Sequence, residues 1–266
     1  ATETWPWNSA GKTLVSTTTG IAQQEGLLNI NNKVSQYLGN GWTSEPLEKE
    51  NLITPRHLLT MTSGLNDESN WVIKSNLTYL ADAGTRWSYS NVFQKLIDVV
   101  AASSNQTFEN YFNAKLKNKI GMDGFWNFGT IFTIYHSNTR SMARFGLLFL
   151  NKGKWKNEQI INETYLNEAI STSQNINPSY GYLWWLNGKS KYMVPGSQTV
   201  YPTALVPNAP ADMYAAMGAE DQRIYVIPSK NMVVIRMGDA SDPQNPNFAL
   251  SGFDAALWDK INAVVR

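Results

Sequence analysis

A serine and a lysine lie three positions apart near the beginning of the 266-residue chain, in the stretch Ser9-Ala-Gly-Lys12. Residues 9–25 are expected to form a helix, because apolar residues recur at helical spacing and Gly26 is a natural stop. One helical turn would place both side chains on the same face. A lysine whose pKa is lowered by burial or by neighbouring positive charge can act as general base for a serine hydroxyl. The backbone N–H at the start of the helix could also bind an oxyanion.

The same residues allow a simpler interpretation, in which Ser9 caps the helix and Lys12 is a solvated surface residue. A chain this rich in serine holds about one S-x-x-K by chance. The only S-x-x-K of this chain opens an expected helix, which is the context that catalysis requires.

A second polar stretch, Tyr89-Ser90-Asn91, directly precedes a strongly amphipathic segment. A tyrosine beside a serine–lysine pair can pass a proton to the leaving group, particularly if the lysine charge lowers the pKa of the tyrosine. Asn91 could hydrogen-bond the lysine or a substrate amide. On its own, the stretch is also typical of a turn with an asparagine helix cap.

The third stretch is an expected strand that ends at Gly218. A glycine lets the backbone approach a ligand closely, and a strand edge beside the nucleophile could supply a second N–H to an oxyanion. The alternative is an ordinary hairpin with a glycine in its loop. Glu220 and Asp221 follow, and a solvated loop is the simplest interpretation of these two residues.

The elements that must position these three stretches change in character near residue 180. Helical patterns dominate before it, and Thr54 followed by Pro55 is a typical helix start. Beyond residue 180, β-branched and aromatic runs alternate with turn residues, which predicts antiparallel strands and a closing helix. The expected helices are 54–64, 91–105, 108–122, 138–153, 162–172 and 252–265, and the expected strands are 180–187, 213–218, 222–229 and 231–238.

Composition excludes several classes of function. The net charge of +1, without a run of lysine and arginine, gives no footprint for nucleic acid or for an acidic membrane surface. Cysteine is absent and the two histidines are His57 and His136, so neither a thiolate site nor a multi-histidine metal site is expected. We expect His57 to be structural and His136 to lie in a capping region. No apolar run approaches the roughly 18 residues of a membrane span.

Together these stretches resemble the serine β-lactamase and penicillin-binding-protein superfamily, most of all its class C-like branch of esterases, D-amino-acid peptidases and nylon-oligomer hydrolases. The likeness runs along nearly the whole chain and includes SAGKTLVSTTTGIAQQEGLL, ITPRHLLTMTSGL, GTRWSYSN, SMARFGLLFLNKGKW, YGYLWW and DQRIYVIPSKNMVVIRMG. It implies an α/β (α+β) fold of the β-lactamase/transpeptidase-like type, in which helices flank an antiparallel sheet and a largely helical region is inserted. The single domain 1–266 would have its sheet part at about 1–28 and 180–266, and its helical region at about 29–179.

The resemblance also implies roles for the candidate residues. Ser9 would be the acylated nucleophile and Lys12 its base partner. Tyr89 and Asn91 match the tyrosine and the asparagine of the Y-x-N motif of the family. No metal and no cofactor are implied.

The oxyanion hole would consist of the backbone N–H groups of Ser9 and of Ala219, which directly follows Gly218. At the third motif of the family, often K-T-G or H-x-G, this chain has Ala216-Met217-Gly218 and no cationic residue. In members that act on β-lactams, that cation helps to hold the substrate carboxylate. Its absence argues against strong β-lactamase activity and favours an ester or amide hydrolase.

A further departure from the family concerns the start of the chain. Eight residues precede Ser9, whereas family members usually carry some tens, including strands that complete the central sheet. Without such strands, a long sheet edge and part of the core would be uncovered. We therefore expect a further N-terminal segment that is cleaved, absent from this sequence or present as a separate chain.

The expected function is that of a serine hydrolase that cleaves ester or amide bonds of a small molecule or short peptide through an acyl-enzyme. The alternatives are a D-amino-acid peptidase or amidase, a weak β-lactamase on the same site, and a catalytically silent penicillin-binding-like module. Four aromatic residues could line a pocket for apolar acyl groups or be plain core: Trp126, Tyr182, Trp184 and Trp185. A bacterial periplasmic or secreted location is expected, and no oligomeric state is predicted.

Overall fold

The C-terminal part of the chain forms a four-stranded antiparallel sheet in the computed structural model, which describes all residues except 1, 130, 245–249 and 266. Its strands, in order across the sheet, are β6 (Trp185–Leu186), β7 (Tyr214–Gly218), β8 (Gln222–Ile227) and β9 (Met232–Arg236). The last three confirm the strands predicted from the sequence. The predicted strand 180–187 is mostly a turn, because the backbone of Leu183 is left-handed (φ 63°).

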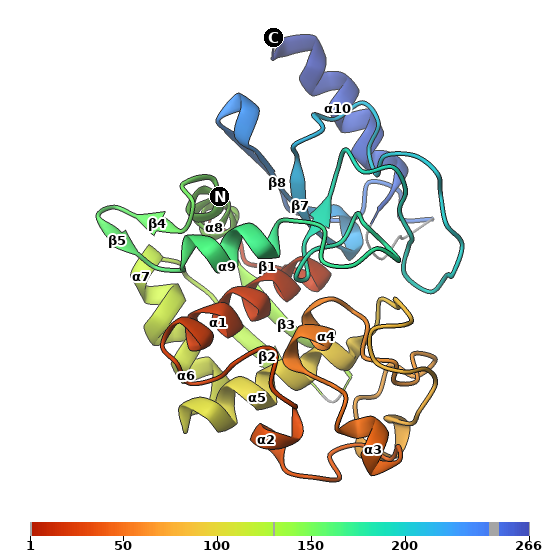
Figure 1. The fold of residues 1–266 in the computed structure, drawn as a ribbon. Coiled ribbons are helices and arrows are strands. Elements are labelled where there is room, and N and C mark those ends of the chain that lie inside the picture. Colours follow the sequence, from red (N-terminus) through yellow and green to blue (C-terminus); the bar gives the residue numbers. More distant parts are fainter. Residues whose placement is uncertain (1, 130, 245–249, 266) are drawn as a thin grey trace.

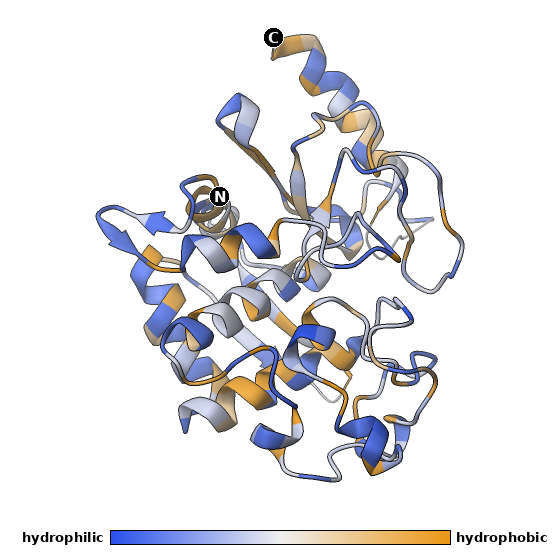
Figure 2. Ribbon diagram, in the orientation of Figure 1, coloured by the Kyte–Doolittle hydropathy of each residue, from blue (hydrophilic) through white to orange (hydrophobic). Residues whose placement is uncertain are grey.

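Two helices cover the two faces of this sheet. Alternate residues of β8 point to opposite faces and therefore contact different helices. Ile224 faces α8 (Thr139–Leu150), where a Cβ on Gly146 would lie 3.1 Å from the Ile224 side chain. The ring of Tyr225 faces α10 (Gly252–Val264) and packs edge-on against Trp258, with the ring centroids 5.8 Å apart. Figure 2 shows orange and blue turns alternating along α10, as expected for a helix with one apolar face.

A second, three-stranded sheet lies largely within the region 29–179 that the sequence predicts as helical. β2 (Phe125–Phe128) and β3 (Thr133–Ser137) form a hairpin, and β1 (Trp5–Pro6) pairs with the free side of β3. Aromatic and β-branched residues in β2 and β3 favour strands over helix. The short strands β4 (Lys154–Trp155) and β5 (Glu158–Gln159) form another hairpin in the same region.

The predicted N-terminal helix is confirmed as α1 (Lys12–Gln24), which crosses the middle of the molecule (Figure 1). It packs against α5 (Lys95–Ser104) and α9 (Glu163–Ala169). All of its residues from Lys12 to Ala22 are buried, although many of them are polar. Its buried threonines can be accommodated because their hydroxyls donate to backbone carbonyls one turn earlier, as Thr17 does to Thr13 at 2.8 Å.

Further short helices complete the part of the chain that the structure describes. They are α2 (Ser35–Leu38), α3 (Leu47–Glu50), α4 (Pro55–Leu59), α6 (Phe108–Phe112) and α7 (Asn118–Ile120). The predicted start of α4 is confirmed, because the Thr54 hydroxyl accepts from His57 N while His57 Nδ1 accepts from Thr54 N. His57 is therefore structural, as expected. Helices around an antiparallel sheet confirm the predicted α/β (α+β) class, and none of the described helices could cross a membrane.

Candidate active site

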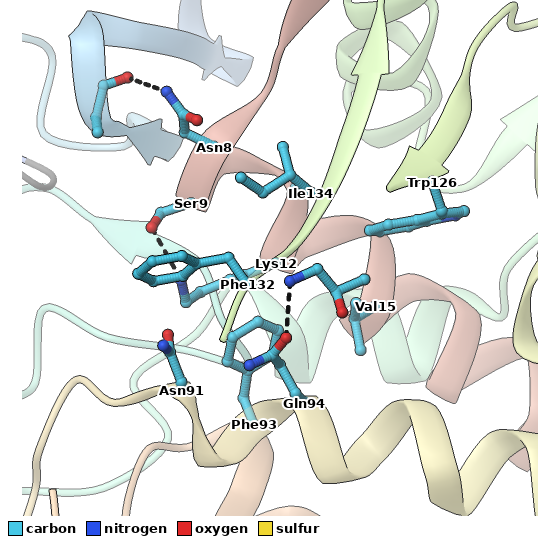
Figure 3. Close-up of a pocket in the computed structure, with 13 residues that line it drawn as sticks. Asn8, Ser9, Lys12, Val15, Asn91, Phe93, Gln94, Trp126, Phe132 and Ile134 are labelled. Atoms are coloured by element: carbon cyan, nitrogen blue, oxygen red, sulfur yellow. Dashed lines mark hydrogen bonds between the residues drawn. The ribbon is translucent and has the colours of Figure 1, made fainter. Parts of the chain in front are cut away.

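Ser9 lies in a 3₁₀ turn (Asn8–Gly11) that continues directly into α1, and Lys12 is the first residue of that helix. Lys12 Nζ donates a hydrogen bond of 2.8 Å to Ser9 Oγ (Figure 3). The turn is anchored just before the serine, where Trp7 N donates to Tyr135 O at 2.8 Å. One local turn, fixed on β3, thus brings the predicted serine–lysine pair together.

The Lys12 side chain is held in apolar surroundings. The residue is 7% exposed, and within the described ranges it forms no ion pair. The ring centroids of Tyr89 and Phe93 lie 4.7 and 4.6 Å from Nζ. Their faces attract the charged form, but burial outweighs this attraction and lowers the pKa of Lys12 to about 7. At neutral pH, much of the lysine is therefore unprotonated and able to accept a proton.

Tyr89 lies beside this pair, because Lys12 Nζ lies over its ring and the Ser9 hydroxyl is near enough to influence the pKa of the phenol. Its ring stacks on Trp185 with the centroids 5.6 Å apart. Burial raises the pKa of Tyr89 well above its usual range, and the Ser9 hydroxyl and the Arg223 charge offset only part of this effect. The condition considered for the relay, a Tyr89 pKa lowered by the lysine charge, is not met, because desolvation of the phenol dominates.

Asn91 lines the same pocket as Ser9 and Lys12, but its side-chain amide already donates hydrogen bonds to backbone carbonyls. Its Nδ2 donates to Asn70 O at 3.1 Å and to Ile131 O at 3.4 Å. The expected hydrogen bond to the lysine does not occur among the described residues. In this conformation Asn91 fixes the loops around the pocket.

β7 brings Gly218 against the turn that carries Ser9. A Cβ at this position would lie 2.5 Å from Trp7 O and 3.1 Å from Ser9 N, so a larger residue would displace the backbone. The next residue, Ala219, lines the same pocket as Ser9. The structure therefore brings together the two residues whose N–H groups were expected to form the oxyanion hole.

Arg223, which sequence reasoning missed, fixes the peptide between Gly218 and Ala219. Its Nη1 donates to Gly218 O at 2.6 Å. In a trans peptide, the C=O and the following N–H point in opposite directions, so the Ala219 N–H points away from the buried guanidinium. A signal was present in the sequence, because an arginine inside the apolar strand run QRIYVI must find a partner when buried.

Two carboxylates hold Arg223 in place. Asp254 accepts from its Nε at 2.7 Å and from its Nη2 at 3.1 Å, while Asp221 accepts from Nη2 at 3.2 Å. Burial alone would lower the pKa of Arg223, but these carboxylates raise it. Burial alone would likewise raise the pKa of Asp221, but hydrogen bonds from Ser241 and Ser251 and the arginine charge lower it. The prediction of a solvated loop is therefore wrong for Asp221.

Asn8, also missed, ties the other side of this loop to the nucleophile. Its Nδ2 donates to Ala219 O at 3.0 Å (Figure 3). The same nitrogen donates to Glu220 Oε2 at 3.2 Å. Asn8, Glu220 and Asp221 all have left-handed backbones, with φ of 48°, 58° and 55°. Asparagine tolerates this region better than most residues, so an asparagine directly before the serine was the available signal.

The sequence model of the beta-lactamase family matches residues 1–250. The chain belongs to this family. It is a family of hydrolases, and the match confirms the superfamily and the fold that the sequence predicted.

Solved structures show the same fold at low sequence identity. A beta-lactamase from Mycobacterium bovis is 20% identical, with a TM-score of 0.70 over 98% of this chain and 87% of the other. A penicillin binding protein from Bacillus halodurans is 15% identical, with a TM-score of 0.63 over 98% and 86%. A family VIII carboxylesterase is 13% identical, with a TM-score of 0.68 over 90% and 80%. No curated protein matches the chain.

In this beta-lactamase family member, Ser9 opens onto a cavity of about 220 Å³. Polar groups of Asn8, Ser9, Lys12 and Asn91 gather at one end. The remaining walls are mainly apolar and include Val15, Phe93, Trp126, Phe132 and Ile134. Among the four aromatic candidates, Trp126 lines this cavity, whereas Tyr182, Trp184 and Trp185 are buried in the core.

The described ranges contain no group of three histidine, cysteine, aspartate or glutamate side chains that could hold a metal ion. His136 belongs to β3 and stacks on Phe125, with the ring centroids 5.2 Å apart. The cap of α8 is Asn138, whose side chain accepts from Ser141 N. His136 thus lies two residues before this cap, as expected for the capping region, but it belongs to a strand.

Proposed function

We propose that this chain is a serine hydrolase that cleaves ester or amide bonds through an acyl-enzyme on Ser9. The observation that carries the proposal is the 2.8 Å hydrogen bond between Lys12 Nζ and Ser9 Oγ, with a lysine pKa of about 7. A buried amine that is uncharged near neutral pH and touches a hydroxyl is suited to act as its general base.

In the acylation step, Ser9 Oγ attacks the carbonyl carbon while its proton passes to Lys12 Nζ. The N–H groups of Ser9 and Ala219 donate to the oxyanion that develops. When the tetrahedral intermediate collapses, Tyr89 gives its hydroxyl proton to the leaving group and recovers a proton from Lys12. Water then attacks the acyl-enzyme, and the same groups pass its proton back to Ser9 Oγ. The raised pKa of Tyr89 keeps this relay protonated at rest.

The site is better suited to esters and amides than to β-lactams that carry a carboxylate. Ala216 supplies no charge at the position where β-lactam-active relatives have a cation. Arg223 on the neighbouring strand is fully buried and engaged by two carboxylates. A family VIII carboxylesterase shares the fold, which supports the choice of an ester substrate. D-amino-acid peptidase, amidase and weak β-lactamase activities remain the alternatives on the same machinery.

The first test is the intact mass of the protein after exposure to a small fluorophosphonate. We expect a single adduct on the wild type and none on Ser9→Ala. Ser16→Ala is the matched control, because Ser16 is a buried serine of α1, the helix that follows Ser9, and its loss should leave labelling unchanged. An adduct that persists in Ser9→Ala, or no adduct on the wild type, would refute the proposal.

A substrate panel then separates the activities that this site could support. It consists of a nitrophenyl acetate, a D-alanine anilide and a chromogenic cephalosporin. We expect the ester to be cleaved at least 100-fold faster than the cephalosporin, because no cation replaces the one missing at Ala216. Preferential cleavage of the anilide would instead assign a D-amino-acid peptidase.

A further inference from the structure

We infer that the cavity beside Ser9 binds the acyl part of the substrate, and that this acyl part is an uncharged, apolar chain or ring of about six to eight carbons. The inference rests on the proposed acyl-enzyme at Ser9 and goes beyond it by assigning the substrate class. It is carried by the shape of the cavity, by the chemistry of its walls and by the place of Tyr89.

The cavity follows one face of α1. Ser9, Lys12 and Val15 succeed one another at three-residue spacing and all line it. At 1.5 Å per residue, the cavity extends about 9 Å from the nucleophile to Val15. Figure 3 shows Ser9 on one side of Lys12, and Val15 and Trp126 on the other. The volume of about 220 Å³ accommodates about seven groups of the size of a water molecule or a methylene.

Apart from the Thr133 hydroxyl, the described interior beyond Lys12 offers few groups that would bind a polar substituent. Among the described lining residues, Lys12 is the only charged one, and it stands beside Ser9. Gln94 lines the cavity, but its Nε2 donates to Ile131 O at 2.9 Å and its Oε1 accepts from Thr133 N at 2.8 Å. Its amide is thus used to hold the segment that roofs the cavity (Figure 3). A charged substituent would lose its water here without gaining a partner.

Tyr89 indicates which half of the substrate the cavity holds. It is the proposed proton donor to the leaving group, and it does not line the cavity. Its ring instead packs against Tyr180 and Trp185, with centroids 6.1 and 5.6 Å away. The leaving group should therefore depart on the Tyr89 side, which leaves the cavity for the acyl group that stays on Ser9.

The test on the wild type is a series of nitrophenyl esters with acyl chains of two to twelve carbons. We expect kcat/KM to rise about three- to fourfold per methylene, because each added group is buried, with a maximum at about six to eight carbons. A 6-aminohexanoyl ester should react at least tenfold more slowly than the hexanoyl ester. Acetate esters of longer alcohols should show no such rise. A flat acyl series, a rise that follows the alcohol, or equal turnover of the aminohexanoyl ester would overturn the inference.

Two variants test the walls of the cavity, and one controls for the substitution itself. Val15→Phe should move the maximum to acyl chains at least two carbons shorter. Phe132→Ala, at a side chain that is 49% exposed and therefore tolerant, should move it to longer chains. Val200→Phe makes the same exchange as the first variant at a site that is 46% exposed and outside the cavity, and should keep the wild-type maximum. An unchanged maximum in both cavity variants would refute the assignment.

Labelling by the small fluorophosphonate distinguishes failure of this inference from failure of the proposed function. If the wild type is not labelled, the serine hydrolase proposal fails, and the acyl site fails with it. If Ser9 is labelled but the acyl series is flat, the hydrolase stands and the acyl site alone is refuted.

Discussion

Lys12 and Arg223 are both buried basic residues near the proposed nucleophile, but their surroundings shift their pKa values in opposite directions. Lys12 has no ion-pair partner among the described residues, and burial lowers its pKa to about 7. Arg223 lies against Asp254 and Asp221, which raise its pKa although burial alone would lower it. A buried charge without a partner releases its proton, whereas one between carboxylates keeps it.

The two residues therefore have different roles in the site: Lys12 takes part in proton transfer, and Arg223 supports the structure. The apolar surroundings of Lys12 favour the neutral amine, which is the form that can accept the Ser9 proton. Arginine stays charged in proteins, and here its charge orients the peptide that ends in Ala219 N–H. The two cations are similarly buried, at 7% and 0% exposure, so the difference comes from the carboxylates beside Arg223 and from the higher ordinary pKa of arginine.

The most direct test of the role of Lys12 is Lys12→Met, which keeps the apolar volume of the side chain and removes the base. We expect kcat for a nitrophenyl ester to fall by about 10⁴-fold, the upper range for loss of general base catalysis. Stopped-flow acylation kinetics measure this loss. Lys95→Met is the matched control, because that lysine lies at the start of α5, pairs with Asp98 and does not line the cavity. A loss below tenfold would show that Lys12 is not the base.

The second test removes one of the two carboxylates that pair with Arg223. Asp254→Asn leaves Arg223 buried with one carboxylate fewer, and we expect the free energy of unfolding to fall by about 3–5 kcal/mol. Urea denaturation measures this change. The double variant Arg223→Met/Asp254→Leu should recover part of the loss, because it removes these two charges together and leaves Asp221 only its hydrogen bonds from Ser241 and Ser251. If the single variant is as stable as the wild type, the pair does not hold the loop.

The sequence predicts the parts of this site whose geometry is local. The turn that leads into α1 joins Ser9 to Lys12, and β-branched and aromatic runs between turn residues predict β7 to β9. Arg223 was missed because its role depends on Asp254, which lies 31 residues further along the chain on another element. The hairpin of β2 and β3 was missed because its strands are short and lie among helical segments. The pKa of Tyr89 depends on burial by distant segments, which spacing along the chain does not reveal.

The third test uses pH, because only one of the two cations should titrate in the working range. We expect kcat/KM to rise tenfold per pH unit below about 7 and then to level off, as Lys12 loses its proton. Tyr89 should cause no loss of activity below pH 10, because its pKa is raised. A bell-shaped profile centred near neutrality would contradict this assignment of the lysine.

The titration of Lys12 should also make the free energy of unfolding depend on pH. Lys12 has a pKa of about 7 in the folded protein against 10.5 as the ordinary value, so between these values the unfolded chain binds more protons. The free energy of unfolding should therefore rise with pH across this window, by up to about 1.4 kcal/mol per unit. Urea titrations at pH 7, 8 and 9 measure the slope, and Lys12→Met should remove this contribution. An equal slope in the variant would mean that another group is responsible.

The smallest expected effect concerns Asn8, which holds the loop of Ala219 from the side opposite Arg223. Asn8→Ala removes both side-chain hydrogen bonds and places alanine in a left-handed backbone, so kcat should fall about five- to tenfold, equivalent to about 1 kcal/mol or slightly more. Asn8→Gly removes the same hydrogen bonds but tolerates φ of 48°. An equal loss in both variants, measured as kcat at saturating ester, would assign the effect to the hydrogen bonds. A loss confined to Asn8→Ala would assign it to the backbone, and Arg223 would then be the main support of the loop.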